Sequence, residues 1–228
     1  MTRLITKIKN TGAFIRNYGI VHFIIELSFR SLDSYHERRL NVVTKGMIKK
    51  VDLKINNPNS IDYVPMEYTA IYSMLKKLPI DKSSSVFLDY GSGKGRAVVV
   101  AATFHFKKVV GIEISEQLVE IAKRNIDRMK YRKTSSVEIK HVDATAFSVP
   151  PDVNMIYFFN PFIGGILQKV VWNIYLSYKN NPRKLYIIFL NNDNFERILR
   201  DQDWLSKTYQ TKFHSYSCGI YETISHRI

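Results

Sequence analysis

The chain has few of the residues that cross-link or interrupt a fold: its 228 residues include one cysteine, seven prolines and ten glycines. The lone Cys218 can form no intramolecular disulfide, and a single thiolate cannot build a metal site. Such sparing use of cysteine favours a reducing, cytoplasmic compartment. The composition therefore excludes a disulfide-linked scaffold and a metal site built on thiolates.

Long apolar runs are also missing. No stretch reaches the ~18 consecutive apolar residues that a membrane-spanning helix needs. The nearest candidate, GIVHFIIELSF at residues 19–29, is short and contains His22 and Glu26. No small-x-small cleavage site follows this run, so we expect no signal peptide. The length suits one α/β domain with a full core and a modest extension.

Negative charge is scarce: 34 lysines and arginines against 20 acidic residues leave a net charge of +14. The first 60 residues hold eleven basic and four acidic side chains, which is half of the excess. A basic surface attracts nucleic acid, anionic lipid or an acidic protein without choosing among them. A solvated, lysine-rich surface without such a partner explains the same numbers.

The charge pattern and the apolar spacing predict two regions. Residues 1–60 form a basic, mainly helical extension, and residues 61–228 form the main domain, with residues 55–65 as the joining loop. An amphipathic helix in the extension could lie on an anionic membrane surface, at the periphery of a membrane, or pack on the main domain. Its apolar stripe consists of Leu4, Ile8, Ile15, Tyr18, Ile25 and Phe29.

From residue 84 onward, short apolar strands alternate with helical patterns. Strands are expected at 85–90, 108–115, 136–144, 153–160 and 184–192, and helices at 96–106, 116–130 and 164–179. Residues 211–224 suggest two strands around Ser217, Cys218 and Gly219 with no helix between them, which indicates an antiparallel hairpin. The order predicts an α/β fold with a doubly wound, mostly parallel seven-stranded sheet and a C-terminal antiparallel hairpin.

A glycine-rich turn lies between the first strand and its helix, in FLDYGSGKGRAVVVAA at residues 87–102. Glycines there permit positive φ angles and close approach of a ligand. The spacing fails the dinucleotide fingerprint, because Arg96 stands at the third glycine position, and no Ser or Thr follows Lys94 as a phosphate-binding loop requires. Asp89 at the end of the strand would repel a pyrophosphate and suits a ligand that carries an ammonium group.

The spacing Asp-x-Gly-x-Gly-x-Gly, formed by Asp89, Gly91, Gly93 and Gly95, resembles the first motif of the class I S-adenosylmethionine-dependent methyltransferases. The resemblance covers about residues 60–228 and implies S-adenosylmethionine as the cofactor.

Two further acids extend this resemblance. It implies that Glu113, at the end of the second strand, holds both ribose hydroxyls, since a carboxylate can accept two such bonds. It implies that Asp143 receives the adenine amino group, although an Asp before Ala-Thr is also typical of a helix N-cap. The complete set of expected cofactor contacts is Asp89, Tyr90, Gly91, Ser92, Gly93, Gly95, Glu113, Ile114, Asp143, Ala144 and Asn160.

The fourth strand ends in Asn160-Pro161-Phe162, which resembles the Asn-Pro-Pro-Tyr/Phe motif of amine-directed methyltransferases. In that motif the side-chain amide and a backbone carbonyl accept hydrogen bonds from an amino group, and the aromatic ring packs on it. The resemblance implies catalytic or substrate-orienting roles for these three residues. Here one proline replaces two, and a strand end followed by a proline-started helix is an equal explanation.

The form DxGSGxGR is similar to the first motif of Dot1-like and related prokaryotic protein lysine methyltransferases, in which a segment before the first strand closes over the cofactor. Residues 63–75, YVPMEYTAIYSML, occupy that place, so Tyr63, Pro65, Glu67 and Tyr68 are expected in the pocket wall. Glu67 is a candidate to deprotonate or orient an amine. Core packing explains the aromatic residues equally well.

The resemblance implies methyl transfer from S-adenosylmethionine to an acceptor, best an amine nitrogen such as a protein lysine. Alternatives are RNA or a small molecule as acceptor, or a catalytically silent adaptor for nucleic acid or membrane. Direct displacement requires alignment of the reactants and no metal, and none is expected. The scattered His105, His141 and His214 are expected to be structural or exposed.

Overall fold

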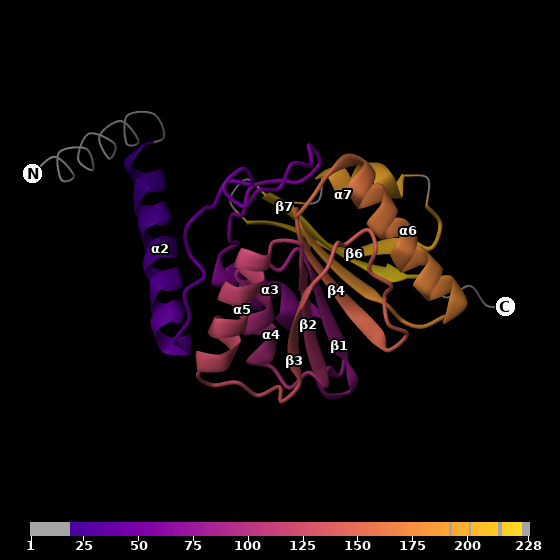
Figure 1. Cartoon of the computed structure of the whole chain (residues 1–228), viewed down its shortest axis with the longest axis horizontal. Coiled ribbons are helices and arrows are strands. Elements are labelled where there is room, and N and C mark those ends of the chain that lie inside the picture. The colour runs from indigo at the N-terminus through magenta and orange to yellow at the C-terminus, as the bar shows by residue number, and fades with distance from the viewer. Residues whose placement is uncertain (1–18, 192, 201, 214–215, 225–228) are drawn as a thin grey trace, which may run out of the picture.

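A seven-stranded sheet with helices on both faces forms the body of the computed structural model (Figure 1). The structure describes residues 19–191, 193–200, 202–213 and 216–224. The strand order is β3-β2-β1-β4-β5-β7-β6. The parallel strands are β1 (Val86–Tyr90), β2 (Lys108–Glu113), β3 (Val137–His141), β4 (Val153–Phe159) and β5 (Tyr186–Leu190). The antiparallel hairpin consists of β6 (Leu205–Phe213) and β7 (Tyr216–Thr223), so the predicted fold is confirmed.

The helices form two layers, one on each face of the sheet (Figure 1). One layer contains α3 (Tyr68–Lys77), α4 (Arg96–Ala102) and α5 (Glu116–Arg128). The other contains α6 (Gly164–Asn180) and α7 (Asp193–Leu199). α2 (Ile20–Leu40) lies beside α3, and the short helix η1 (Lys82–Ser84) precedes β1.

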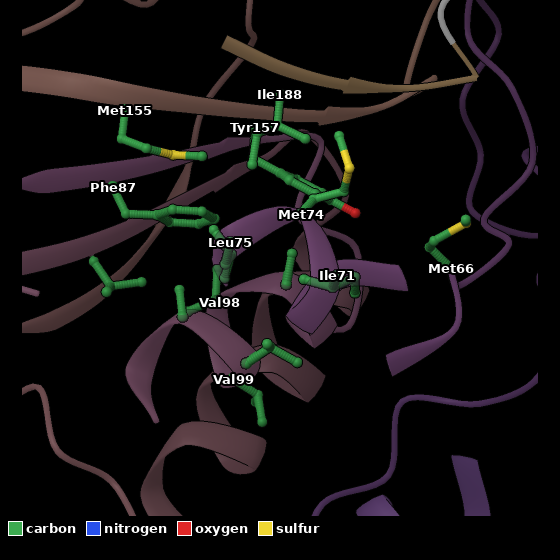
Figure 2. Close-up of a cluster of buried hydrophobic side chains, with 14 of the residues drawn as sticks. Met66, Ile71, Met74, Leu75, Phe87, Val98, Val99, Met155, Tyr157 and Ile188 are labelled. Atoms are coloured by element: carbon green, nitrogen blue, oxygen red, sulfur yellow. The ribbon is translucent and has the colours of Figure 1, made fainter. Parts of the chain in front are cut away.

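Alternation along the strands decides which side chains reach the first helical layer. Phe87 of β1 and Tyr157 of β4 point into the core beneath α3 and α4, together with Ile71 and Met74 of α3 (Figure 2). Asp89 lies two residues beyond Phe87, on the same face, and is paired in register with Tyr157. The carboxylate therefore faces the α3 layer at the carboxyl end of the strand, where the glycine turn begins.

The helix after the glycine turn is shorter than predicted. It was expected over residues 96–106 and ends at Ala102. Phe106 returns to the core with 4% of its surface exposed, and its N–H donates to Thr134 Oγ1 at 3.1 Å. Residues 104–106 therefore form a connection that leads into β2, with Phe106 packed in the core and His105 exposed.

The C-terminal hairpin was predicted with its turn in the wrong place. Cys218 and Gly219 were expected at the turn, but both lie inside β7, paired with Leu190 and Phe189 of β5. The turn lies between Phe213 and Tyr216, because β6 begins as early as Leu205. The short helix α7 was not predicted, since its seven residues bury only Phe195 and carry little apolar periodicity.

The C-terminal half of α2 packs on the main domain. Leu40 is buried in the core beneath α3 and α4, and the ring of His36 stacks on Tyr68 of α3. Towards its N-terminus the helix exposes Ile20 and Ile24. The described helices include none that is long and apolar enough to cross a membrane. Membrane contact of the extension stays a prediction.

Part of the predicted apolar stripe lies outside the described residues. Four of its positions belong to residues 1–18, namely Leu4, Ile8, Ile15 and Tyr18. The side chain of Ile25 is not described either, and Phe29 is half-buried. Packing of the extension is therefore seen for the second half of α2.

Candidate cofactor and acceptor site

A cavity of about 330 Å³ opens at the carboxyl ends of β1, β2 and β4. Its volume falls in the usual range of small-molecule sites, about 300–1,000 Å³. Chain order reverses between β1 and β4, so the cavity occupies the position where ligands bind in open α/β sheets. Residues 53–66 close it from above, so the predicted extension contributes Leu53, Ile55, Asn57 and Ser60 to its wall. The division at residue 60 stays a prediction.

The glycine turn is held in a conformation that suits glycine. Gly91, Gly93 and Gly95 have φ angles of 70°, 55° and 83°. A Cβ on Gly91 would lie 2.3 Å from Cβ of Pro161, and one on Gly93 would lie 2.2 Å from Cε2 of Tyr63. The turn therefore touches the segment after β4 on one side and the N-terminal segment on the other.

Substitution Gly93→Ala is expected to lower the free energy of unfolding by about 1–3 kcal/mol for the left-handed φ, and further through the clash with Tyr63. In a Tyr63→Ala background the clash disappears, so the same substitution should be less destabilising. Urea denaturation of the four proteins in this double-mutant cycle measures the difference. An equal effect of Gly93→Ala in both backgrounds would show that the ring does not constrain the turn.

Glu113 is a fixed hydrogen-bond acceptor at the end of β2. Its carboxylate accepts the N–H of Gly93 at 2.9 Å, of Ile114 at 3.0 Å and of Ser115 at 2.9 Å. Burial raises the pKa of Glu113, and the three N–H groups oppose this effect. The side chain therefore joins the glycine turn to the turn after β2, at the position expected for ribose.

Asp89 is a buried acid without a cationic partner among the described residues. Its side chain is 3% exposed and, within the part of the chain that the structure describes, makes no hydrogen bond or ion pair. Burial, and then the charge of Glu113, raise the pKa of Asp89 well above its ordinary value. A positive group in the cavity would favour the ionised carboxylate.

Asp143 lines the cavity together with Ala144 and Ile114. Its Oδ1 accepts the N–H of Thr145 at 2.7 Å and the hydroxyl of Thr145 at 2.8 Å. No helix follows in residues 143–150, so the alternative of a helix N-cap is wrong, and the residue closes a turn. Oδ2 remains available to a ligand.

The segment after β4 forms the other end of the cavity. Asn160 has a φ of 39°, and its Oδ1 is buried without a hydrogen-bond partner. Pro161 rests on Gly91, and Phe162 is 6% exposed with its ring edge-on to Tyr90. All three residues from Asn160 to Phe162 line the cavity, and their catalytic roles stay predictions.

Some of the remaining predicted site residues lie away from the cavity lining. Tyr63 and Pro65 line the wall, whereas Tyr68 is fully buried beneath α2 with its hydroxyl 3.1 Å from Oγ1 of Thr44, so its prediction was wrong. Glu67 precedes α3 and is not part of the lining. Tyr90 is not part of the lining, because its ring packs on Phe158 in the core on the α6 side of the sheet.

The histidines of the described residues lie apart from one another in the sequence. His105 and His141 are exposed, as expected, and His214 lies outside the described residues. Among the residues described, no group of three or more His, Cys, Asp or Glu side chains is placed to hold a metal ion.

The sequence reasoning missed Lys94, which stands inside the glycine turn. Its Nζ donates to the carbonyl oxygens of Lys45 at 2.7 Å and Gly46 at 3.2 Å, and lies 5.0 Å from the centre of the Tyr63 ring. The side chain therefore ties the N-terminal segment over the turn. The alternation of Lys94 and Arg96 with the glycines of the turn was the sequence signal that could have indicated this role.

Arg96, at the start of α4, was also missed. It is 4% exposed, and its Nη1 donates to Asp33 Oδ2 at 2.5 Å and to the carbonyl oxygen of Met66 at 2.7 Å. Its Nε donates to Oγ1 of Thr44 at 2.7 Å, and Nη2 lies 3.6 Å from a carboxylate oxygen of Glu37. Asp33 and Glu37 are four residues apart and therefore share one face of α2. This spacing could have indicated a common cationic partner.

Comparisons with known proteins agree with this architecture. A family model described as "Histone methylation protein DOT1" matches residues 49–150. A curated "Protein-lysine N-methyltransferase" of Saccharolobus islandicus (strain REY15A) is 33% identical over 69 residues, which are 30% of this chain. The match spans 42% of the length of that relative.

Two solved structures show the same fold at low identity. An RNA methyltransferase from Salinibacter ruber, in complex with S-adenosyl-L-homocysteine, superposes with a TM-score of 0.57 at 20% identity, covering 72% of this chain and 95% of that one. A SAM-dependent methyltransferase from Aquifex aeolicus gives 0.51 at 14% identity, covering 70% and 100%. The chain therefore has the fold of the class I S-adenosylmethionine-dependent methyltransferases.

Proposed function

We propose that the protein is an S-adenosylmethionine-dependent methyltransferase that acts on an amine nitrogen, with a protein lysine as the preferred acceptor. The description of the matching family and the name of the archaeal relative support protein lysine over other amines. The cavity between the glycine turn and the Asn160 segment supports one site for both reactants.

The residues of the cavity fit the cofactor. Asp89 would receive the ammonium of the methionine moiety, Glu113 the ribose hydroxyls and Asp143 the adenine amino group. Ser92 lines the cavity, and its buried Oγ lacks a hydrogen-bond partner within the described residues. When bound, the cofactor supplies an electrophilic methyl group. The chain's own contribution is to align the acceptor with that group and to exclude water.

The observation that carries the choice of an amine is the buried Oδ1 of Asn160. An unsatisfied buried acceptor costs about 1–3 kcal/mol, so a ligand that brings an N–H donor to it gains that amount. Asn160 has a left-handed backbone, and it lines the same cavity as Pro161 and Gly91, which are in contact. A primary amine can donate one N–H there and keep its lone pair for the methyl carbon.

The competing acceptor is RNA. The net charge of +14 is the observation that favours it, because a basic surface attracts phosphates. A silent adaptor is a weaker alternative, since such a protein has no need for Asp89 to be ionisable and buried in a cavity.

Substitution Asn160→Ala is expected to reduce kcat roughly 5- to 150-fold, the equivalent of one lost hydrogen bond to a buried or charged group. Cofactor affinity should change less than about threefold, because the residue acts on the acceptor. The assay uses radiolabelled S-adenosylmethionine with a lysine-containing peptide, the same peptide with arginine at each lysine, and total RNA. Asn180→Ala, at the exposed end of α6, is the matched control.

Label in the lysine peptide but not in the arginine peptide supports the proposal. Label in RNA alone would overturn the acceptor assignment. Calorimetric binding of S-adenosylmethionine without transfer to any acceptor, peptide or RNA, would favour the adaptor.

A further inference from the structure

A second hollow, of about 940 Å³, lies on the opposite edge of the sheet from the cavity. Its walls come from α2, α3, η1 and the turns that follow α4 and α5. η1 precedes β1, residues 103–105 precede β2 and residues 131–133 precede β3, so this groove lies at the amino ends of the parallel strands. It shares no residue with the cavity.

Aromatic rings form the floor of this basal groove. The ring centres of His36 and Tyr72 are 5.3 Å apart, and those of Tyr72 and Phe104 are 5.9 Å apart. Tyr131 adds a ring at one side, with 62% of its surface exposed. The rings come from four separate segments and line one hollow, where Tyr131 is the most exposed of them.

Cations surround these rings. The groove is lined by one acid, Asp81, and by Arg39, Lys76, Lys82 and Lys133. Within the described residues none of these four cations forms an ion pair. The guanidinium carbon of Arg39 lies 5.3 Å from the ring centre of Tyr131, and Nζ of Lys82 lies 5.6 Å from that of Phe104.

We propose that the basal groove binds single-stranded nucleic acid, with phosphates on the cations and bases on the aromatic rings. A row of stacking surfaces inside a cationic groove is the arrangement that such ligands require, and every base has a π-face to offer. An acidic peptide would form ion pairs with the cations, but its carboxylates would not stack on the aromatic rings. The groove holds the chain on a nucleic acid while the cavity remains open at the other edge of the sheet, so this proposal is independent of the methyl acceptor.

The test measures binding of a fluorescein-labelled twelve-nucleotide oligouridylate to the full chain by fluorescence anisotropy. The triple variant Arg39→Gln, Lys76→Gln, Lys133→Gln removes three groove cations. The triple variant Lys123→Gln, Lys169→Gln, Lys179→Gln removes three exposed lysines elsewhere and has the same net charge. Counterion release predicts that the groove variant lowers the slope of log affinity against log salt by about 2, with no such change in the control.

The aromatic part is tested by Tyr131→Ala, which changes an exposed ring and leaves the core intact. Its expected effect is a roughly 5- to 150-fold loss of affinity, as for one stacked base. Trp172→Ala, an exposed ring on α6, should have none. Equal losses in groove and control variants, or tighter binding of polyglutamate or of duplex than of oligouridylate, would overturn the proposal.

Discussion

Substitution Arg96→Met is expected to lower the free energy of unfolding by about 3–5 kcal/mol, the usual effect of removing one partner from a buried ion pair. The guanidinium is 4% exposed and faces Glu37, which is 5% exposed, as well as Asp33. Methionine removes the cation from the face of the Tyr68 ring, leaves Asp33 without its cation and leaves Glu37 with only the exposed Lys45, 3.7 Å away. The large effect therefore follows from uncompensated charge.

The same substitution should weaken binding of S-adenosylmethionine. Arg96 holds Thr44 and the carbonyl oxygen of Met66, and these residues bracket the segment that covers the cavity. Release of this segment increases the entropy lost on binding. Urea denaturation and calorimetric titration of the full chain measure the two effects.

Two comparisons make the test specific. Arg124→Met on the exposed face of α5 should change neither quantity by more than the ~0.5 kcal/mol typical of surface substitutions. Adding Asp33→Asn to Arg96→Met should recover part of the lost stability, because it removes one of the unpaired carboxylates. If the double variant is less stable than Arg96→Met alone, the ion-pair explanation is wrong.

Substitution Asp89→Asn is expected to stabilise the unliganded protein at neutral pH and to weaken binding of S-adenosylmethionine roughly 10- to 150-fold. The loss of affinity corresponds to one hydrogen bond with a charged group, about 1.5–3 kcal/mol. The gain in stability follows from burial, since the carboxylate is 3% exposed and its ionised form lacks a cation in the unliganded cavity.

The pH dependence has a definite sign. Burial raises the pKa of Asp89 in the folded state, so between the unfolded pKa near 4 and the folded pKa the folded chain binds more protons than the unfolded chain. Stability from this group therefore falls as pH rises through that window. The asparagine variant lacks this loss, so its advantage in melting temperature should grow as pH rises above about 4.

Melting temperatures of the wild type, Asp89→Asn and the exposed control Asp127→Asn over that pH range test the prediction. Titration with S-adenosylmethionine at neutral pH tests the affinity. An advantage of Asp89→Asn that stays constant with pH would refute the raised pKa. Unchanged affinity would remove Asp89 from the cofactor site.

Local patterns in the sequence were sufficient for the fold and for part of the site. β1 and β5 are short, mostly apolar runs buried along their whole length, and the glycine spacing marks the turn after β1. Because parallel strands end at one edge, Asp89, Glu113 and Asp143 could be brought to a common cavity from their positions after strands alone. Each strand, and the residue at its end, can be recognised from neighbouring positions in the sequence.

Prediction from the sequence failed where contacts between distant residues set the end of a helix or the place of a turn. The helix after the glycine turn ends early because Phe106 returns to the core. The hairpin turn lies before Cys218, between Phe213 and Tyr216, because Cys218 and Gly219 pair with β5 inside β7. Propensity in a short window carries no information on these tertiary contacts.

The sequence by itself determined the layer architecture and the glycine turn. It also determined that Asp89, Glu113 and Asp143 lie at the carboxyl ends of their strands. Only the tertiary structure decided that Lys94 and Arg96 hold the N-terminal segment, and that Oδ1 of Asn160 is buried without a partner. The ion pair between Arg96 and Asp33 joins residues 63 positions apart, and the rings of the basal groove come from four segments. Such contacts depend on how helices pack on the sheet, and that packing is a property of the whole core rather than of any local pattern.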